Sequence, residues 1–452
     1  MTTASHTTPP QPSALRSLPS ALPQDDAQRQ VLHDEVHARP PARIRLPALV
    51  VYVAVLNDGV SREMEWEHLR RLPGQEGLTL EQLSGNFQRL RFANHTLKWE
   101  RHTEFTRYSL VQALPDKAMT GCTDEEMIAE LVIDPQWLAQ IPGRTIAAIM
   151  LAMVHGDVDD AAAMRAQAAP WINDPAILAS LLGIRRSCAM TNFELRDSGF
   201  ERILVISPPN TSELRSGRTS QRLLELETYR IMALRGLPVA KDLGAMLSES
   251  ENQLAEITAE MENTEASDQD LLNQLIGLAA RVERATAKHM YRFSATEAYH
   301  NLVEQRITQL RETPIPGTQT IGEFMQRRVA PAMTTVQATA RRLSLLSQRI
   351  ERASALLRTR VDIATETQNQ MLLEKLTKGQ ALQLRLQTTV EGLSIAAISY
   401  YVVSLILYAG KAGKAAGLPI NPEILAGSMI PAVLLGIWWG TQRIHKILKA
   451  DH

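Results

Sequence analysis

Two stretches near the carboxy terminus carry no charged side chain, and they constrain the fold more than any other feature of the sequence. They cover residues 392–410 and 424–442. As helices, each would be about 28 Å long, close to the hydrocarbon thickness of a bilayer. Tyr400 and Tyr401 in the first stretch and Trp438 and Trp439 in the second are rings typical of membrane interfaces. We therefore predict a transmembrane helical hairpin over residues 392–442, with two buried core helices as the alternative.

The charges beside this hairpin indicate which side of the membrane the rest of the chain occupies. Basic residues flank both of its outer ends, namely Lys375, Lys378, Arg385, Arg443, Lys446 and Lys449. Positive residues accumulate on the cytoplasmic side, although Lys411 and Lys414 in the connecting loop oppose this assignment. Residues 1–24 contain no apolar block that could serve as the core of a signal peptide. We expect most of the chain to be cytoplasmic, with a disordered leader (1–30) and a basic cytoplasmic tail (443–452).

The composition limits what the rest of the chain can be. Its 452 residues are 44% hydrophobic and 21% charged, which is typical of a folded protein with two or three structural units. The 48 basic and 49 acidic residues nearly cancel, which excludes a bulk electrostatic affinity for nucleic acid. The two cysteines cannot form a disulfide framework or a structural zinc site alone.

The middle of the chain is predicted to form very long helices. No proline occurs between Pro238 and Pro314, or between Pro331 and Pro419. We expect one long helical stretch in each interval, with a break at Gly277 in the first and a turn at residues 313–317 between them. From residue 343 to residue 371, apolar residues recur at steps of three and four, which predicts a coiled-coil stalk that runs into the first span.

Charge is segregated along these helices. Residues 243–280 contain eight acidic residues and no lysine or arginine, whereas residues 341–360 contain six arginines and one acidic residue. Antiparallel helices would bring the two blocks together, which is the interpretation we favour. A divalent-cation or polyamine site on the acidic helix, or a solvated helix face, are the alternatives.

The amino-terminal part has the alternating pattern of strands. Residues 46–56, 144–154 and 200–207 are apolar enough for inner strands, and residues 97–110 predict one strand with two different faces. Helices are expected at residues 61–72, 124–133 and 159–169. The predicted fold is α+β: an amino-terminal α/β domain with a mixed sheet (31–215), a long-helix region with a helical hairpin and stalk (216–391), and the transmembrane hairpin (392–442).

Two groups of residues in this domain resemble chemical sites. His33 and His37 imitate the zinc-peptidase motif H-E-x-x-H, but prolines follow at once, and we favour a capping or hydrogen-bonding role for His37 and Arg39. On one face of the strand predicted at 97–110, Glu100, His102 and Glu104 could bind a metal, or they could form cross-strand pairs with arginines such as Arg91 or Arg107. The sequence has no glycine-rich nucleotide loop, C-x-x-C or nucleophile elbow, so we expect neither an enzyme nor a cofactor.

Two motifs carry a family resemblance. E-V-H-A-R-P and K-W-E-R-H-T-E-F resemble motifs of an uncharacterised bacterial family of membrane-anchored proteins, a domain of unknown function that covers nearly the whole chain. The motif residues are Glu35, His37, Arg39, Pro40, Trp99, Glu100, Arg101 and His102. The resemblance implies a protein of the bacterial inner (plasma) membrane.

The order of the predicted parts is similar to that of CorA-type magnesium channels, homopentamers in which the first span lines the pore. Their G-M-N signature would fall at Tyr408, Ala409 and Gly410, where it is absent. We therefore expect a CorA-like oligomeric ion conduit without this signature or, as the alternative, a non-conducting membrane-anchored scaffold or sensor. An enzyme using the histidine-rich amino-terminal segments is the least favoured class. The expected partners are the lipid bilayer, further copies of the chain and, for a conduit, a divalent cation, but no nucleic acid.

Overall fold

The computed structural model describes residues 26–448 except 31, 34–39, 175, 264–266, 418 and 420. The chain forms two compact units. The first lies within Met1–Glu256 and Gly277–Ile350, and the second within Ile257–Ile276 and Glu351–His452. The sheet of the first unit includes a strand from beyond residue 310.

The first unit contains a nine-stranded sheet in the order β2-β3-β4-β1-β5-β8-β7-β6-β9. The strands are β1 (Ala48–Leu56), β2 (Phe87–Arg91), β3 (His95–Arg101), β4 (Phe105–Ala113), β5 (Arg144–His155), β6 (Leu178–Leu182), β7 (Ser187–Thr191), β8 (Glu201–Ser207) and β9 (Thr313–Pro314). Strands β5 and β8 pair in parallel, and the other pairs are antiparallel. The predicted mixed sheet and its three apolar strands are confirmed.

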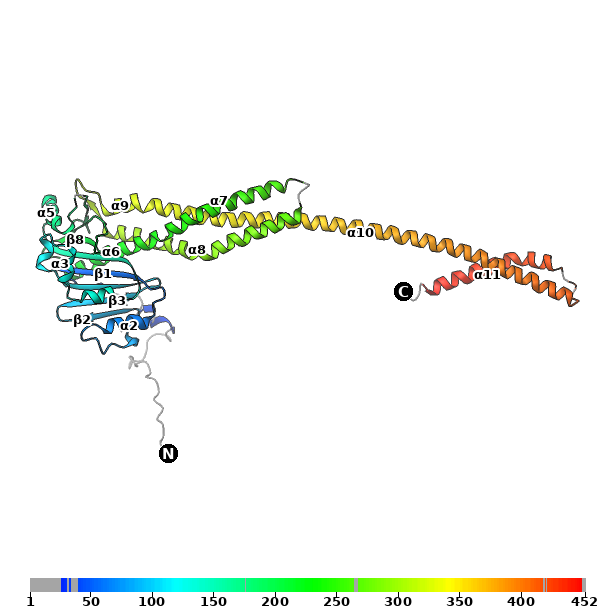
Figure 1. Cartoon of the computed structure of the whole chain (residues 1–452), viewed down its shortest axis with the longest axis horizontal. Helices are drawn as coiled ribbons and strands as arrows, with labels where there is room; N and C mark the ends of the chain where they lie inside the picture. Colours follow the sequence, from blue (N-terminus) through cyan, green and yellow to red (C-terminus); the bar gives the residue numbers. More distant parts are fainter. Residues whose placement is uncertain are drawn as a thin grey trace, which may run out of the picture. The chain divides into compact units, whose positions relative to one another are not determined.

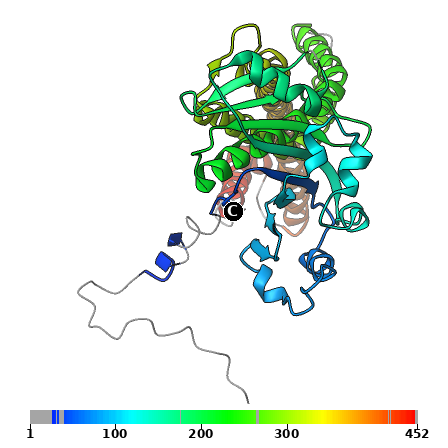
Figure 2. The same ribbon diagram turned by 90° about the vertical axis from the view of Figure 1, so that its left-hand side faces the viewer.

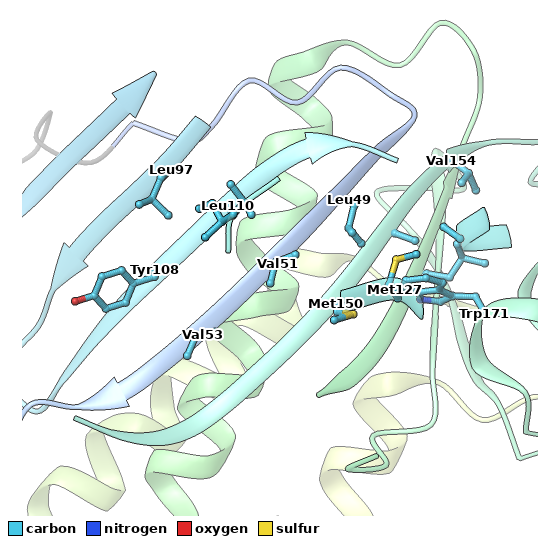
Figure 3. Close-up of a cluster of buried hydrophobic side chains, with 14 of the residues drawn as sticks. Leu49, Val51, Val53, Leu97, Tyr108, Leu110, Met127, Met150, Val154 and Trp171 are labelled. Atoms are coloured by element: carbon cyan, nitrogen blue, oxygen red, sulfur yellow. The ribbon is translucent and has the colours of Figure 1, made fainter. Parts of the chain in front are cut away.

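The central strands are apolar because both faces of the sheet are covered. In β1, Leu49, Val51 and Val53 pack into one core (Figure 3), whereas Val50 and Tyr52 pack into a second core on the opposite face. Residues of the second core also come from helices beyond residue 213. Alternating residues of a strand point to opposite faces, so each strand contributes to both cores.

Different helices cover the two faces. The first core includes residues of α2 (Arg62–Arg70), α3 (Asp124–Ala129), α4 (Pro135–Ala139) and α5 (Ala161–Ile172). The second includes residues of α6 (Glu213–Leu234), α8 (Asp268–Leu310), α9 (Ile321–Arg328) and the start of α10 (Ala330–Ala415). Two short 3-10 helices, Leu80–Leu83 and Asp116–Met119, lie in loops. The predicted amino-terminal helices are confirmed; Figure 2 looks toward this unit.

The first long helical stretch differs from the prediction. It consists of α7 (Gly236–Glu260) and α8, with a turn after Glu260, and Gly277 lies inside α8. The turn falls at the acidic end of α7, where negative side chains oppose the helix dipole. Ser267 then begins α8, because its hydroxyl accepts a hydrogen bond from the Asp270 N–H.

The turn predicted at residues 313–317 carries an unpredicted edge strand. In β9, Thr313 pairs with Leu181 of β6, and Pro314 pairs with Ser180. Proline is tolerated there because an edge strand has one side without a ladder.

The second long helix, α10, is continuous, as predicted. Its apolar seam is buried only in part: Leu343, Leu346, Ile350 and Leu357 are buried, whereas Met371 is 58% exposed. Two ion pairs join the acidic and basic blocks. In the first unit, Arg342 forms an ion pair with Glu251 (Nη2 to Oε2, 2.7 Å). In the second unit, Arg360 forms an ion pair with Asp268 (Nε to Oδ2, 3.0 Å). Figure 1 labels α7, α8 and α10.

The end of α10 and helix α11 (Pro422–Leu448) are both long and apolar enough to cross a membrane. Only 6% of each apolar window is buried within the chain. Two buried core helices, the alternative considered from the sequence, do not fit this exposure. The rings of Tyr400, Tyr401, Trp438 and Trp439 are exposed as well, which suits helices surrounded by lipid.

Candidate functional site

The first unit contains a cavity of about 510 Å³ lined by five arginines. It lies between the β6–β7 turn, the amino-terminal half of α6 and the end of α8. The arginines are Arg186, Arg215, Arg218, Arg222 and Arg311, and the other lining residues are Leu182, Gly183, Ser187, Thr219, Thr308, Gln309 and Leu310. No aspartate or glutamate is among these lining residues. We call this site the arginine cavity.

Local structure places the five arginines together. Arg215, Arg218 and Arg222 are spaced by three and four residues along α6, so they share one face of this helix. Arg186 comes from the β6–β7 turn, which is joined to the end of α8 by a hydrogen bond from the Gly183 N–H to the Leu310 carbonyl (3.0 Å). Arg311 directly follows α8.

The β6–β7 turn has an unusual backbone. Gly183, Ile184 and Arg185 have φ angles of 59°, 61° and 59°. This left-handed region is unfavourable for a β-branched residue such as Ile184, and strained backbone of this kind occurs often at functional sites. The turn carries Arg186 to the cavity.

Among the described residues, no ion pair neutralises the positive charge of the cavity. Within the described part of the chain, none of the five guanidinium groups has a carboxylate oxygen within 4.0 Å. Glu225 of α6 forms ion pairs with Arg107 (3.1 Å) and Arg306 (2.6 Å) instead. Burial and the charges of neighbouring arginines, first that of Arg218, lower the pKa of Arg222. The cavity is therefore suited to an anion.

The K-W-E-R-H-T-E-F motif has a structural role. Glu100 is fully buried and bonds Lys98 (3.0 Å) and Arg107 (2.5 Å), its cross-strand neighbour on β4. Burial alone would raise the pKa of Glu100, but the charges of Arg107 and Lys98 outweigh it and lower the pKa to about 2. Through Arg107 and Glu225, this ionic network joins the sheet to α6. Cross-strand pairing of Glu100 with an arginine, one of the two predicted roles, is thus observed.

The other motif residues are held by separate contacts. Trp99 is fully buried in the first core, and Arg101 bonds Glu65 at 2.6 Å. His102 stacks on Phe105, with ring centroids 4.6 Å apart. These contacts hold the β3–β4 region in place, and Trp99, Arg101 and His102 are not among the residues that line the arginine cavity.

The metal candidates do not converge. The single strand predicted over residues 97–110 was wrong, because it is a hairpin of β3 and β4 with Glu104 in the turn. Glu104 bonds Arg292 at 2.7 Å, whereas Glu100 bonds Lys98 and Arg107. Among the residues described, no group of three or more His, Cys, Asp or Glu side chains could hold a metal ion.

Two other predicted groups lie elsewhere. Glu35, His37 and Arg39 are outside the described residues, and the Pro40 carbonyl accepts a hydrogen bond from Arg89 (2.9 Å). Tyr408, Ala409 and Gly410, the pore-mouth equivalents, lie within α10. A Cβ atom on Gly410 would be 3.3 Å from Pro422, so this glycine allows the start of α11 to approach closely.

Sequence reasoning missed the arginine cavity. The available signal was R-S-G-R-T-S-Q-R at residues 215–222, a basic face without an acidic residue between Glu213 and Glu225. Arg186 and Arg311 are too distant along the chain for any spacing rule to join them to this segment.

A family model described as "Protein of unknown function (DUF3422)" matches residues 24–448. No curated protein and no solved structure matches the chain.

Proposed function

Because the chain belongs to the DUF3422 family, whose function is unknown, we propose a function from its structure: a non-conducting, membrane-anchored sensor. The observation that carries this proposal is the contrast between the two ends of the chain. The sheet unit buries apolar cores on both faces, whereas the two apolar helices bury only 6% of their windows. Lipid is the environment that would cover the exposed apolar surface.

The proposed location is the bacterial inner membrane, with the sheet unit in the cytoplasm. The basic residues that flank the outer ends of the two candidate spans support this orientation. Helix α10 contains residues of both units without interruption, so it is the element through which we propose that the two communicate.

A CorA-like conduit is the second candidate, but the first span offers little to an ion. Selectivity filters use carbonyl oxygens or charged side chains to replace the ion's hydration shell. The Ser399 hydroxyl donates to the Ile395 carbonyl (2.7 Å), and the Ser404 hydroxyl donates to the Tyr400 carbonyl (2.8 Å). These hydroxyls therefore satisfy their own helix, which favours the non-conducting function.

Self-association of the stalk is part of the proposal. Beyond Leu357, α10 exposes large apolar residues, and Leu372, Leu376, Leu386 and Val390 are each more than half exposed. These four residues occupy a and d positions of one heptad register, in which residue 376 is an a position and the intervening d and a positions are Gly379 and Gln383. Copies anchored in the same membrane would present these faces in parallel.

Site-directed labelling tests the membrane topology. The native cysteines, Cys122 and Cys188, are buried, so the only reactive thiols would be introduced ones. With a membrane-impermeant maleimide on intact spheroplasts, Lys414→Cys should be labelled, whereas Leu195→Cys, 69% exposed in the sheet unit, should be labelled only after permeabilisation. Labelling of Lys414→Cys only after permeabilisation, or release of the chain by alkaline carbonate, would refute the topology.

Flux and subunit counting test the rest of the proposal. Purified chain in liposomes should carry no Mg²⁺ or K⁺ above the level of empty liposomes, and selective flux would favour the conduit instead. Native mass measurement in detergent should show an oligomer that Leu376→Lys dissociates. The exposed position Arg352→Lys serves as the control, and a monomeric native chain would contradict self-association.

A further inference from the structure

We propose that the arginine cavity binds a small soluble molecule with two or more linked phosphate groups. This inference concerns the sheet unit alone and does not depend on the membrane topology proposed above. If the chain is a sensor, this molecule would be its ligand. The binding test below can fail or succeed independently of the tests of membrane topology and ion flux.

Uncompensated charge is the first reason. Five guanidinium groups surround about 510 Å³ and, among the described residues, have no carboxylate within 4.0 Å. Their mutual repulsion is an electrostatic cost in the free protein. The pKa of Arg222 is lowered first by burial and then by the charges of nearby arginines, of which Arg218 and Arg311 line the cavity. A polyanion would remove that cost on binding.

The type of donor is the second reason. Guanidinium groups present planar pairs of N–H donors that match phosphate oxygens. Two of the three hydroxyl groups that line the cavity are already used: the Ser187 hydroxyl donates to the Arg186 carbonyl (2.7 Å), and that of Thr308 donates to the Glu304 carbonyl (2.9 Å), which leaves the Thr219 hydroxyl beside the five arginines. The arginines are therefore the main groups that can hold a ligand.

Size and polarity restrict the ligand further. The volume lies within the range of small-molecule pockets, about 300–1,000 Å³, and exceeds the needs of a single phosphate. No aromatic side chain is among the lining residues, so a base or ring would find no stacking surface. Recognition is thus directed at the phosphate chain itself, and a triphosphate, with four to five negative charges, best matches five arginines.

The test measures binding of inorganic tripolyphosphate to the full chain in detergent. Thermal unfolding and calorimetry at fixed ionic strength would compare tripolyphosphate with pyrophosphate, phosphate and sulfate. We expect tripolyphosphate to raise the melting temperature most, and phosphate and sulfate to bind at least tenfold more weakly. Equal effects of all four anions would overturn the proposal, because they would indicate only general screening.

Matched variants locate the site. Arg218→Gln with Arg222→Gln should weaken tripolyphosphate binding at least tenfold, without lowering the melting temperature of the ligand-free chain. Arg349→Gln with Arg352→Gln removes the same charge from exposed positions that, among the described residues, have no carboxylate within 4.0 Å, and it should change binding less than twofold. If the first pair does not fold, Arg186→Gln with Arg311→Gln, both exposed, gives the same test. Unchanged binding in the folded cavity variants would refute the site.

A phospholipid headgroup has related chemistry, and a further arm separates it from a soluble ligand. Dihexanoyl phosphatidic acid, which is soluble as a monomer, should bind at least tenfold more weakly than tripolyphosphate. Tighter binding of the lipid would overturn the proposal of a soluble ligand and assign the cavity to a lipid headgroup.

Discussion

Replacing Glu100 with glutamine should destabilise the sheet unit, because this carboxylate is buried between two cations. Its side chain is fully buried, and those of Lys98 and Arg107 are 9% and 4% exposed. These contacts lower the pKa of Glu100 from 4.5 to about 2. A difference of this size corresponds to about 3 kcal/mol of unfolding free energy at pH 7, similar to the cost of breaking a buried ion pair.

The sign of the pH dependence follows from the lowered pKa. The charged form is favoured in the folded state, so its contribution is complete above pH 4.5 and is lost as the pH falls toward 2. The difference in unfolding free energy between the native chain and Glu100→Gln should therefore be about 3 kcal/mol at pH 7 and should shrink below pH 4.5.

Urea unfolding followed by tryptophan fluorescence would measure this difference, since Trp99, Trp137 and Trp171 are buried in the first core. Glu130→Gln is the control, because Glu130 pairs with Lys117 at the surface, where an ion pair contributes about 0–1 kcal/mol. Equal unfolding free energies for Glu100→Gln and the native chain at pH 7, or a difference that does not shrink in acid, would refute the reasoning.

Three further changes have defined outcomes. Burial and a neighbouring carboxylate raise the pKa of Glu201 to about 9, so the neutral form is favoured and stability should fall as the pH rises from about 4.5 to 9. In Glu201→Gln, chemical unfolding across this pH range should show a smaller decline. Arg342→Glu should lower the melting temperature through repulsion of its acidic partner, whereas Arg349→Glu, whose arginine has no carboxylate within 4.0 Å in the described chain, should lower it less. Leu357→Ala should cost about 2–5 kcal/mol in urea unfolding because this leucine is fully buried, and an equal loss in the half-exposed Leu372→Ala would reveal an intermolecular contact.

The hydrophobic pattern of the sequence predicted those helices and strands whose apolar residues match the surroundings of the element in the fold. The inner strands were predictable because a strand covered on both faces must be apolar throughout, as in β1. The continuity of α10 followed from the lack of proline in its interior, and the two candidate spans followed from uncharged runs of membrane length.

The remaining features depend on tertiary contacts. The sequence predicts one strand in place of the hairpin of β3 and β4, because Arg101, His102 and Thr103 keep the alternation of a strand through the turn. The arginine cavity could not be predicted, since it joins a turn, a helix face and a helix end that are far apart in the sequence. The ion pairs could be predicted only in part. The sequence predicts Arg107 as a partner of Glu100, but it does not predict that Glu225 and Arg306 belong to the same network.

The sheet is complete only after the edge strand β9 has been synthesised, which is more than one hundred residues after β8. Thr313 and Pro314 pair with β6. A nascent chain that has reached only residue 312 therefore leaves the edge of β6 unpaired and lacks α9 over the second core. An open edge can pair with the edge of another molecule. Fragments that end after β8 would keep the open edge of β6 and would lack α9 over the second core. Aggregation of such fragments on expression would therefore not indicate that the complete protein is unstable.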